Sequence, residues 1–208
     1  MSELFGETWI TSRQKRTFDL ATSSALMPLA IPASLVGAAA FYLETHVNPF
    51  FSQSRLGRHN TPMHVLKLRS MPFKQDFNDA SNGHGDERAS KVGRFLRKTA
   101  LDEVPQIFNI LVGQMSVVGP RPLIASDVEM TMELLNPSEQ KDWIKSRSIA
   151  KPGWLSDFVN VSRSMIPQSK EYLLTRVELD CRYVLEASHQ TDMKIIRNAL
   201  SMGFAAIQ

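Results

Sequence analysis

The longest apolar stretch of the chain lies near its N-terminus, where no charged residue occurs between Asp19 and Glu44. As a helix this stretch would reach about 36 Å, enough to cross a hydrocarbon core of about 30 Å. Pro28 and Pro32 interrupt it, and each proline removes a backbone donor and clashes with the preceding turn. We therefore expect a membrane segment that kinks or breaks at these prolines. A cleaved signal peptide and a buried helix of a soluble protein are the alternatives.

Basic residues flank the apolar stretch on both sides. They are Arg13, Lys15 and Arg16 before it and Arg55, Arg58, Lys67, Arg69 and Lys74 after it, with no Asp or Glu between Thr45 and Gln75. By the positive-inside rule both ends face the cytoplasm. The stretch is therefore expected to form a re-entrant hairpin that dips into one leaflet. Residues 1–47 would hold this membrane segment, and residues 48–208 would form a small cytoplasmic domain.

Shorter periodic segments follow. Apolar and β-branched runs at residues 50–54 and 63–68 flank a turn-prone segment and predict a β-hairpin. Helical spacing is expected over residues 89–98, 104–111 and 129–135 and again in the tail, residues 169–207, where Leu173, Val177, Cys181, Val184 and Leu185 form an apolar stripe. Residues 73–87 are rich in Asn, Asp, Ser and Gly and are expected to form a loop. The pattern predicts a mostly helical α+β fold.

Composition narrows the function classes. The chain has 208 residues, of which 43% are hydrophobic and 22% charged, as in an ordinary folded domain. Its formal net charge is only +3, and no nucleic-acid-binding module is recognisable, so nucleic acid is not an expected partner. The lone cysteine, Cys181, excludes an internal disulfide and is expected to be a packing residue. The five histidines have no ligand spacing, which argues against a zinc site.

An adjacent acid pair, Asp102 and Glu103, is the first candidate for chemistry. Thr99 could be an N-cap and Pro105 fits a first helical turn, so the pair should lie at or beside a helix N-terminus. Unpaired amides there favour negative charge and could also hold a phosphate. Taken alone, the pair is more simply interpreted as two first-turn acids on a surface helix.

Cations near the acid pair change this interpretation. Arg121 lies between two prolines in the segment Gly119-Pro120-Arg121-Pro122, which would preorganise it as a phosphate fork. The other nearby cations are Arg94, Arg97, Lys98, Arg55, Lys67 and Arg69. Together they suggest a site for a phosphorylated lipid and a phosphorylated soluble substrate. Cations that merely anchor the protein to anionic headgroups are the alternative, which explains the charges but not the acid pair.

The block LDEVPQIFNILVGQMSVVGPRP, residues 101–122, resembles the bacterial sugar transferases, the monotopic polyprenyl-phosphate phosphoglycosyl transferases. Further matches lie at residues 15–19, 51–57, 67–71 and 86–88, with weaker ones at 178–183 and 192–195. The resemblance implies a magnesium-dependent enzyme that moves a sugar 1-phosphate from a UDP-sugar to polyprenyl (undecaprenyl) phosphate and so initiates bacterial surface glycan synthesis. The short segment before Thr11 suggests the compact catalytic-core form, at the inner membrane and facing the cytoplasm.

The same resemblance assigns roles to individual residues. Asp102 would be the nucleophile that forms a phosphosugar-aspartyl intermediate, and Glu103 would help place Mg²⁺. By the same resemblance Arg97 and Arg121 would neutralise the phosphates, and Lys67, Arg69 and Asp86 are further candidates for contact with phosphate or metal. Arg94 and Arg55 are candidates for phosphate or substrate binding by their charge and position alone. Pro32 would be the proline that breaks the membrane helix.

Two departures from the family pattern leave details open. Ile31 stands before Pro32 where the family usually has serine, and Pro28 is additional, so the geometry of the break is open. Residues 152–163 keep the Pro-Gly pair and the final arginine but lack the usual Thr-Gly and Gln. The donor sugar is therefore open, with a UDP-hexose or UDP-HexNAc preferred, as are the glycan pathway and a homodimeric state. A catalytically silent protein that binds lipid phosphates or recruits partners is the alternative function.

Overall fold

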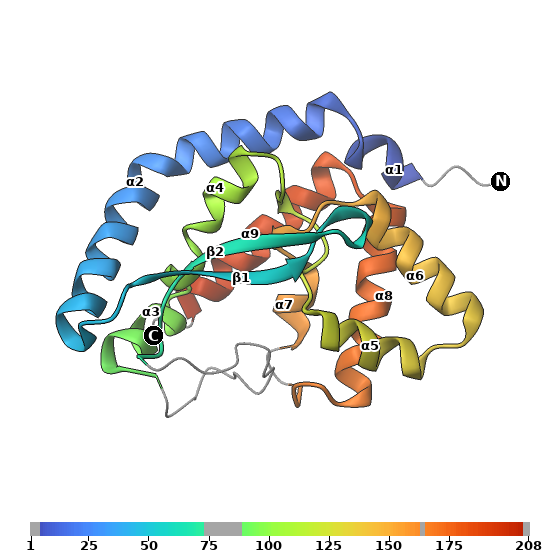
Figure 1. Ribbon diagram of the computed structural model, residues 1–208. Coiled ribbons are helices and arrows are strands. Elements are labelled where there is room, and N and C mark those ends of the chain that lie inside the picture. Colours follow the sequence, from blue (N-terminus) through green and yellow to red (C-terminus); the bar gives the residue numbers. More distant parts are fainter. Residues whose placement is uncertain (1–4, 73–88, 163–164, 206–208) are drawn as a thin grey trace.

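A computed structural model of the chain describes residues 5–72, 89–162 and 165–205 (Figure 1). In chain order the elements are α1 (Phe5–Ile10), α2 (Arg13–Thr45), β1 (Phe50–Leu56), η1 (Arg58–Asn60), β2 (Pro62–Leu68), α3 (Lys91–Lys98), η2 (Leu101–Glu103), α4 (Gln106–Leu111), β3 (Ser116–Val118), α5 (Ala125–Leu134), α6 (Pro137–Ile149), β4 (Gly153–Leu155), α7 (Asp157–Val161), α8 (Lys170–Glu186) and α9 (His189–Ala205). The fold is mostly helical, as the sequence predicts, and it contains two small sheets.

Helix α2 is a single element of 33 residues that includes Pro28 and Pro32. Its N-terminus is capped by Ser12, whose side chain accepts a hydrogen bond from the amide of Lys15 at 3.0 Å. The helix is long and apolar enough to cross a membrane. Figure 1 shows its axis turning along one edge of the molecule, so the expected kink is present, whereas the expected break into two helices is not.

Both ends of α2 pack on the rest of the chain. Near the start, Asp19 Oδ1 accepts hydrogen bonds from Ser116 Oγ at 2.9 Å and from the Val117 amide at 3.0 Å. Near the end, Ala38 and Phe41 are buried in a cluster with residues of β2 and α3. The apolar side chains between these ends are exposed: Leu26, Leu29, Ile31, Leu35 and Val36. The middle of the helix therefore presents an uncovered apolar surface, as a lipid-facing segment would.

The predicted β-hairpin is confirmed, and each strand is longer than the sequence pattern indicates. Strands β1 and β2 are antiparallel over their whole length, from the pair Phe50 and Leu68 to the pair Leu56 and Pro62. Helix α4 is tied to β2 by Asn109, whose side chain accepts from the Leu66 amide at 3.0 Å and donates to the His64 carbonyl at 2.7 Å. The hairpin is therefore held in register with the segment that carries the acid pair.

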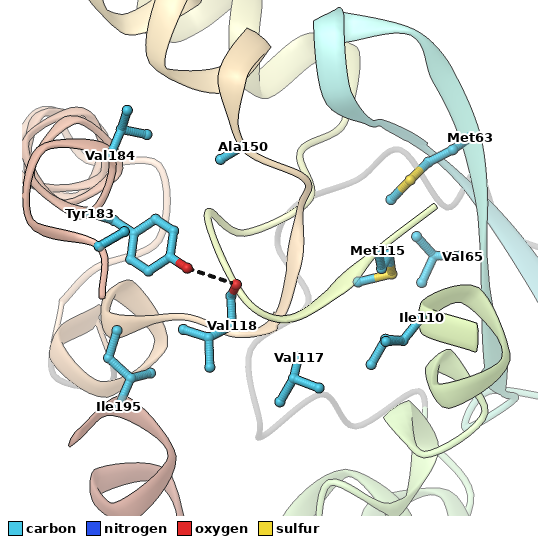
Figure 2. Close-up of a cluster of buried hydrophobic side chains, with 11 residues drawn as sticks. Met63, Val65, Ile110, Met115, Val117, Val118, Ala150, Tyr183, Val184 and Ile195 are labelled. Carbon is cyan, nitrogen blue, oxygen red and sulfur yellow. Dashed lines mark hydrogen bonds between the residues drawn. The ribbon is translucent and has the colours of Figure 1, made fainter. Parts of the chain in front are cut away.

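A second sheet, absent from the sequence prediction, pairs β3 with β4 in parallel, with Ser116 opposite Gly153 and Val118 opposite Leu155. It lies in the largest buried cluster, shown in Figure 2, where side chains from β2, α4, β3, α8 and α9 meet. In that view the Tyr183 hydroxyl donates to the Val118 carbonyl at 3.0 Å. The sheet thus joins the middle of the chain to its C-terminal helices.

The tail forms two helices, α8 and α9. Of the predicted stripe, Leu173 and Val184 are buried, but Leu185 is 50% exposed, so its assignment to the core face is wrong. Cys181 packs beside the buried cluster of Leu123, Leu135 and Trp143, and burial raises the pKa of its thiol. This agrees with a packing role rather than a nucleophilic one, because the thiolate is the reactive form.

A buried charge cluster fastens the start of α2 to α9. Lys15 Nζ lies 2.7 Å from Asp192 Oδ2 and 3.3 Å from Asp19 Oδ1, and all three side chains are almost completely buried. The Lys15 ammonium also donates to the Val118 carbonyl at 3.1 Å, and the Trp9 indole donates to Asp192 at 3.0 Å. Removing one member of such a cluster leaves the others as uncompensated charges in a medium of low polarity.

We expect Lys15→Met to lower the free energy of unfolding by about 3–5 kcal/mol, because two buried carboxylates would lose their shared cation. Chemical denaturation in detergent, followed by tryptophan fluorescence, measures this change. Lys141→Met, at an exposed position on α6, is the matched control and should change it by less than about 0.5 kcal/mol. A loss below about 1 kcal/mol for Lys15→Met would show that the cluster is not a structural anchor.

Candidate active site

A tight turn between α3 and α4 carries the acid pair. Thr99 ends α3 as its C-cap, so its predicted role as an N-cap is wrong. Ala100 then adopts a left-handed conformation with φ 54°, which is uncommon for a residue with a side chain. Asp102 and Glu103 follow in the 3₁₀ turn η2, and Pro105 precedes the first residue of α4. The pair therefore lies just before a helix rather than within its first turn.

Cations from three separate segments surround the acid pair. Lys67 Nζ, on β2, donates to Glu103 Oε1 at 2.9 Å. Arg121, from the loop after β3, has its Nη2 3.7 Å from the same oxygen. Arg97, on α3, acts on Asp102 by its charge, and its Nε donates to Ser70 Oγ at 2.7 Å. The structure thus brings together three of the predicted phosphate-binding residues.

A small pocket opens beside Glu103. Arg55, Lys67 and Arg121 line one part of it, and Gln106, Gly153 and Trp154 line another. Arg55 is held there by its Nη2, which donates to Gln53 Oε1 at 2.7 Å. Burial, together with the positive charge of Arg121, lowers the pKa of Arg55 to about 10. Cations crowded in this way would be stabilised by an anionic ligand.

The two carboxylates differ in protonation behaviour although they are adjacent. Burial and the negative charge of Glu103 raise the pKa of Asp102 to about 6, against the opposing charges of Lys67 and Arg97. Burial would also raise the pKa of Glu103, but the charges of Lys67 and Arg121 outweigh it and lower the pKa to about 2. Glu103 is therefore ionised and paired with Lys67 and Arg121. The ionised form of Asp102 is less stabilised by its surroundings, which makes Asp102 the better nucleophile.

These opposite shifts predict opposite effects on stability in metal-free buffer at pH 8. Above pH 6 the folded protein is destabilised by ionised Asp102, so Asp102→Asn should raise the free energy of unfolding by about 1–3 kcal/mol. Glu103 stabilises the folded state above its unfolded pKa, so Glu103→Gln should lower the free energy by about 1–3 kcal/mol.

Denaturation curves at pH 8 and pH 4 in EDTA test both signs. The increase in the free energy of unfolding caused by Asp102→Asn should vanish by pH 4. The wild-type carboxyl is then protonated in the folded state, so no buried charge destabilises it. A gain that is equal at both pH values, or a loss at pH 8, would contradict the assignment of the raised pKa to Asp102.

The remaining predicted site residues have different contacts. Arg69 donates from Nε to the Asn48 carbonyl at 2.9 Å and lies over the Phe51 ring. Arg94 donates from Nη1 to the Ala89 carbonyl at 2.7 Å. Neither contact involves the acid pair, so a role for these two arginines at the site stays a prediction. Asp86, predicted as a metal contact, lies outside the described residues.

The sequence links residues 152–163 to the choice of donor but does not single out the residues that line the pocket. Trp154 and Gly153 reach the pocket only because β4 pairs with β3, which also carries the chain into the loop of Arg121. Gln106 is buried in the first turn of α4 and lines the same pocket. The Pro152-Gly153 pair is the sequence feature that could have pointed to Gly153. In the structure a glycine is needed there, because an added Cβ would collide with the backbone of Gly119.

Comparison with known proteins identifies the family of the chain. A family described as bacterial sugar transferase matches residues 10–206, which is nearly the whole chain. The chain therefore belongs to the bacterial sugar transferase family.

Relatives in this family carry informative names. The chain is 34% identical over 194 residues to a UDP-glucose:undecaprenyl-phosphate glucose-1-phosphate transferase of Klebsiella pneumoniae, covering 91% of this chain and 40% of that protein. It is 30% identical over 197 residues to a UDP-N-acetylgalactosamine-undecaprenyl-phosphate N-acetylgalactosaminephosphotransferase of Aeromonas hydrophila, covering 92% and 44%. It is also 34% identical over 184 residues to the uncharacterized sugar transferase EpsL of Bacillus subtilis, covering 88% and 83%. The chain thus spans less than half the length of the first two relatives.

Proposed function

We propose that this chain is a phosphoglycosyl transferase that moves a sugar 1-phosphate from a UDP-sugar to undecaprenyl phosphate. The observation that carries the proposal is the difference in ion pairing and pKa between the two acids. Glu103 is paired with Lys67 and Arg121, whereas Asp102 has a raised pKa and lies among cations that could bind phosphate. The names of the relatives support a UDP-hexose or a UDP-N-acetylhexosamine as donor. The product, a lipid-linked sugar, would be the first intermediate of a bacterial surface glycan.

In the first step, a carboxylate oxygen of Asp102 attacks the sugar-linked phosphorus of the donor. A new bond forms between that oxygen and phosphorus, and the bond from phosphorus to the bridging oxygen of the diphosphate breaks. UMP leaves with the electron pair of the broken bond. Asp102 then carries the phosphosugar as a mixed anhydride.

The cations have distinct tasks in this step. The charge of Arg97 acts on Asp102 and would offset the repulsion between the carboxylate and the incoming diphosphate. Arg121 and Arg55 line the pocket beside Glu103, where they would bind the phosphoryl oxygens and the departing UMP. Lys67 holds Glu103 ionised and fixed in place.

In the second step, a phosphate oxygen of undecaprenyl phosphate attacks the same phosphorus. The bond between Asp102 and phosphorus breaks, so the carboxylate is regenerated and undecaprenyl diphosphate sugar is released. Because the attacking oxygen is already anionic, this step needs no general base. One carboxylate therefore serves as nucleophile in the first step and as leaving group in the second.

The acid pair fits the predicted Mg²⁺ by its chemistry. Mg²⁺ prefers oxygen ligands and is commonly held by one or two carboxylates together with substrate phosphates. Among residues 5–72, 89–162 and 165–205 no group of three His, Cys, Asp or Glu side chains could hold a metal alone. Lys67 and Arg121 keep Glu103 ionised, and both lie beside its Oε1 atom. Its other carboxylate oxygen, Oε2, would contact the metal beside a bound diphosphate. When bound, Mg²⁺ would neutralise negative charge on the diphosphate.

The packing of α2 supports a dip into one leaflet rather than a crossing. Asp19 near its start and Phe41 near its end both contact the same folded body. A straight crossing of the bilayer would separate these two contacts by the hydrocarbon core, which is about 30 Å thick. The exposed apolar middle of α2 would enter the leaflet instead, and the acid pair would lie near the cytoplasmic surface where a polyprenyl phosphate headgroup is accessible.

The test is a turnover assay with the detergent-solubilised protein, Mg²⁺, undecaprenyl phosphate and a panel of UDP-sugars. We expect UMP release with at least one UDP-hexose or UDP-N-acetylhexosamine. Without the lipid, UMP release should stop after a single turnover. Absence of UMP from every donor, with folding verified by circular dichroism, would favour the silent lipid-phosphate-binding protein.

A further inference from the structure

A second basic pocket lies at the start of α2, on residues that the reaction does not use. It has a volume of about 120 Å³, and its lining includes Lys15, Arg16, Asp19, Arg58 and Lys151. None of these residues lines the pocket beside Glu103. Figure 2 shows Ala150, Val118 and Tyr183 together on the side of the buried cluster away from Met63 and Val65.

Positive charge exceeds negative charge in this pocket. Lys15, Arg16, Arg58 and Lys151 line it. Asp19 also lines it, but its Oδ1 lies 3.3 Å from Lys15 Nζ, which also lies 2.7 Å from Asp192 Oδ2. The positive charges of Arg16, Arg58 and Lys151 are left without an acidic partner among the described residues.

The two arginines are oriented by neutral groups that leave donors available. Arg16 donates from Nη1 to the Ile110 carbonyl at 2.6 Å and from Nη2 to the Leu111 carbonyl at 2.7 Å. Arg58 donates from Nε to the Ser148 carbonyl at 3.3 Å. A guanidinium has five N–H donors, so each arginine keeps further hydrogens for a ligand. Carbonyl acceptors fix the position of the charge without cancelling it.

Lys151 completes the group. No hydrogen bond or ion pair within residues 5–72, 89–162 and 165–205 engages its Nζ. A Cβ added at Gly113 would lie 3.7 Å from Lys151 Nζ and 3.5 Å from Arg16 Nη2, so both cations border the same small space. Burial, together with the charge of Arg16, lowers the pKa of Lys151, and these effects outweigh the opposing charge of Asp19.

We propose that Arg16, Arg58 and Lys151 form a second anion site, which binds a phosphate group apart from the reaction at Asp102. Phosphate fits better than a carboxylate because it carries up to two negative charges and presents oxygens to three donors in different directions. The phosphate could come from an anionic lipid headgroup, since the pocket lies at the start of the membrane helix, or from a soluble phosphate. This site does not depend on the proposed transferase reaction.

Chemical footprinting of Lys151 tests the site in the intact protein. The protein in a phosphate-free maltoside detergent is treated with a limiting acetylating reagent, and the acetylation rate of each lysine is measured by peptide mass spectrometry. Inorganic phosphate is compared with chloride at equal ionic strength, and vesicles of phosphatidylglycerol are compared with vesicles of phosphatidylcholine. Lys145, exposed on α6, is the internal control.

We expect one of the two phosphate sources to slow the acetylation of Lys151 by about fivefold or more while Lys145 changes less than about twofold. Protection by inorganic phosphate would identify a soluble ligand, and protection by phosphatidylglycerol alone would identify a lipid headgroup. Arg58→Gln should remove most of the protection, because Arg58 shares the anion, whereas Lys145→Gln should leave it unchanged. Absence of protection from both sources, or equal protection of Lys145, would overturn the proposal.

Discussion

Replacing Asp102 with asparagine is expected to lower turnover by at least about 10³-fold, which corresponds to about 4 kcal/mol of lost transition-state stabilisation. The amide has nearly the same shape but lacks the anionic oxygen that would attack phosphorus in the proposed reaction. The variant should still fold, because the pKa of Asp102 is raised and its ionisation therefore destabilises the folded state of the wild type. UMP release with the preferred donor measures the change.

Binding to membranes provides the discriminating comparison for this variant. Asp102→Asn should sediment with anionic vesicles as the wild type does, because the cations and α2 are unchanged. Asp142→Asn, an exposed carboxylate on α6, is the matched control and should retain full turnover. If Asp102→Asn keeps more than about a tenth of the wild-type turnover, Asp102 is not the nucleophile.

Replacing Gly153 with alanine is expected to lower the free energy of unfolding by about 3 kcal/mol and to impair turnover at the same time. An added Cβ would collide with the amide nitrogen and carbonyl oxygen of Gly119 and with the Leu155 carbonyl. These are backbone atoms of the β3–β4 pair, so they cannot move aside as a flexible side chain would. Because the Gly153 amide donates to the Pro120 carbonyl at 2.8 Å, the shift would reach Arg121 in the pocket.

Thermal unfolding and UMP release measured on the same preparation test this coupling. Gly57→Ala is the control, because its added Cβ would meet atoms at 3.2 Å or beyond, including the flexible side chain of Met63. It should cost less than about 1 kcal/mol. Wild-type stability in Gly153→Ala would mean that the close contact between Gly119 and Gly153 is not required for the fold.

The hairpin and the helical character of the chain could be predicted because both depend on local patterns. Short apolar and β-branched runs on each side of a turn-prone segment predict β1 and β2, and their pairing is confirmed from Phe50 to Leu56. The grouping of Lys67, Arg97 and Arg121 around the acid pair is predicted from their positive charge and from the family resemblance, because Lys67 and Arg121 lie far from Glu103 along the chain. Spacing in sequence carries no information about such distances.

Other features depend on tertiary contacts that override local preference. The buried face of residues 169–207 is predicted from apolar residues alone, yet α8 also buries Arg176 and Asp180. Arg176 pairs with Asp127 at 3.1 Å, and Asp180 pairs with Arg147 at 2.9 Å. Charged residues are buried only when paired, and the partners come from other helices. The periodicity of one helix therefore cannot reveal them.

The turn that carries the acid pair shows the same limitation at shorter range. Threonine is common at helix N-caps, but Thr99 is the C-cap of α3. The left-handed conformation of Ala100 then redirects the chain into η2. Alanine seldom adopts this conformation, so no residue preference indicates it. Contacts around the turn, including the Ala100 amide donating to the Arg97 carbonyl at 3.1 Å, stabilise it instead.

The most direct test of the proposed reaction is mass spectrometry of the protein after brief exposure to its preferred UDP-sugar and Mg²⁺ without lipid acceptor, followed by acid quenching. We predict a mass increase of one sugar phosphate, located by peptide analysis at Asp102, absent from Asp102→Asn and lost when undecaprenyl phosphate is added before quenching. UMP release and lipid-linked product without any adduct at Asp102 would contradict the covalent mechanism.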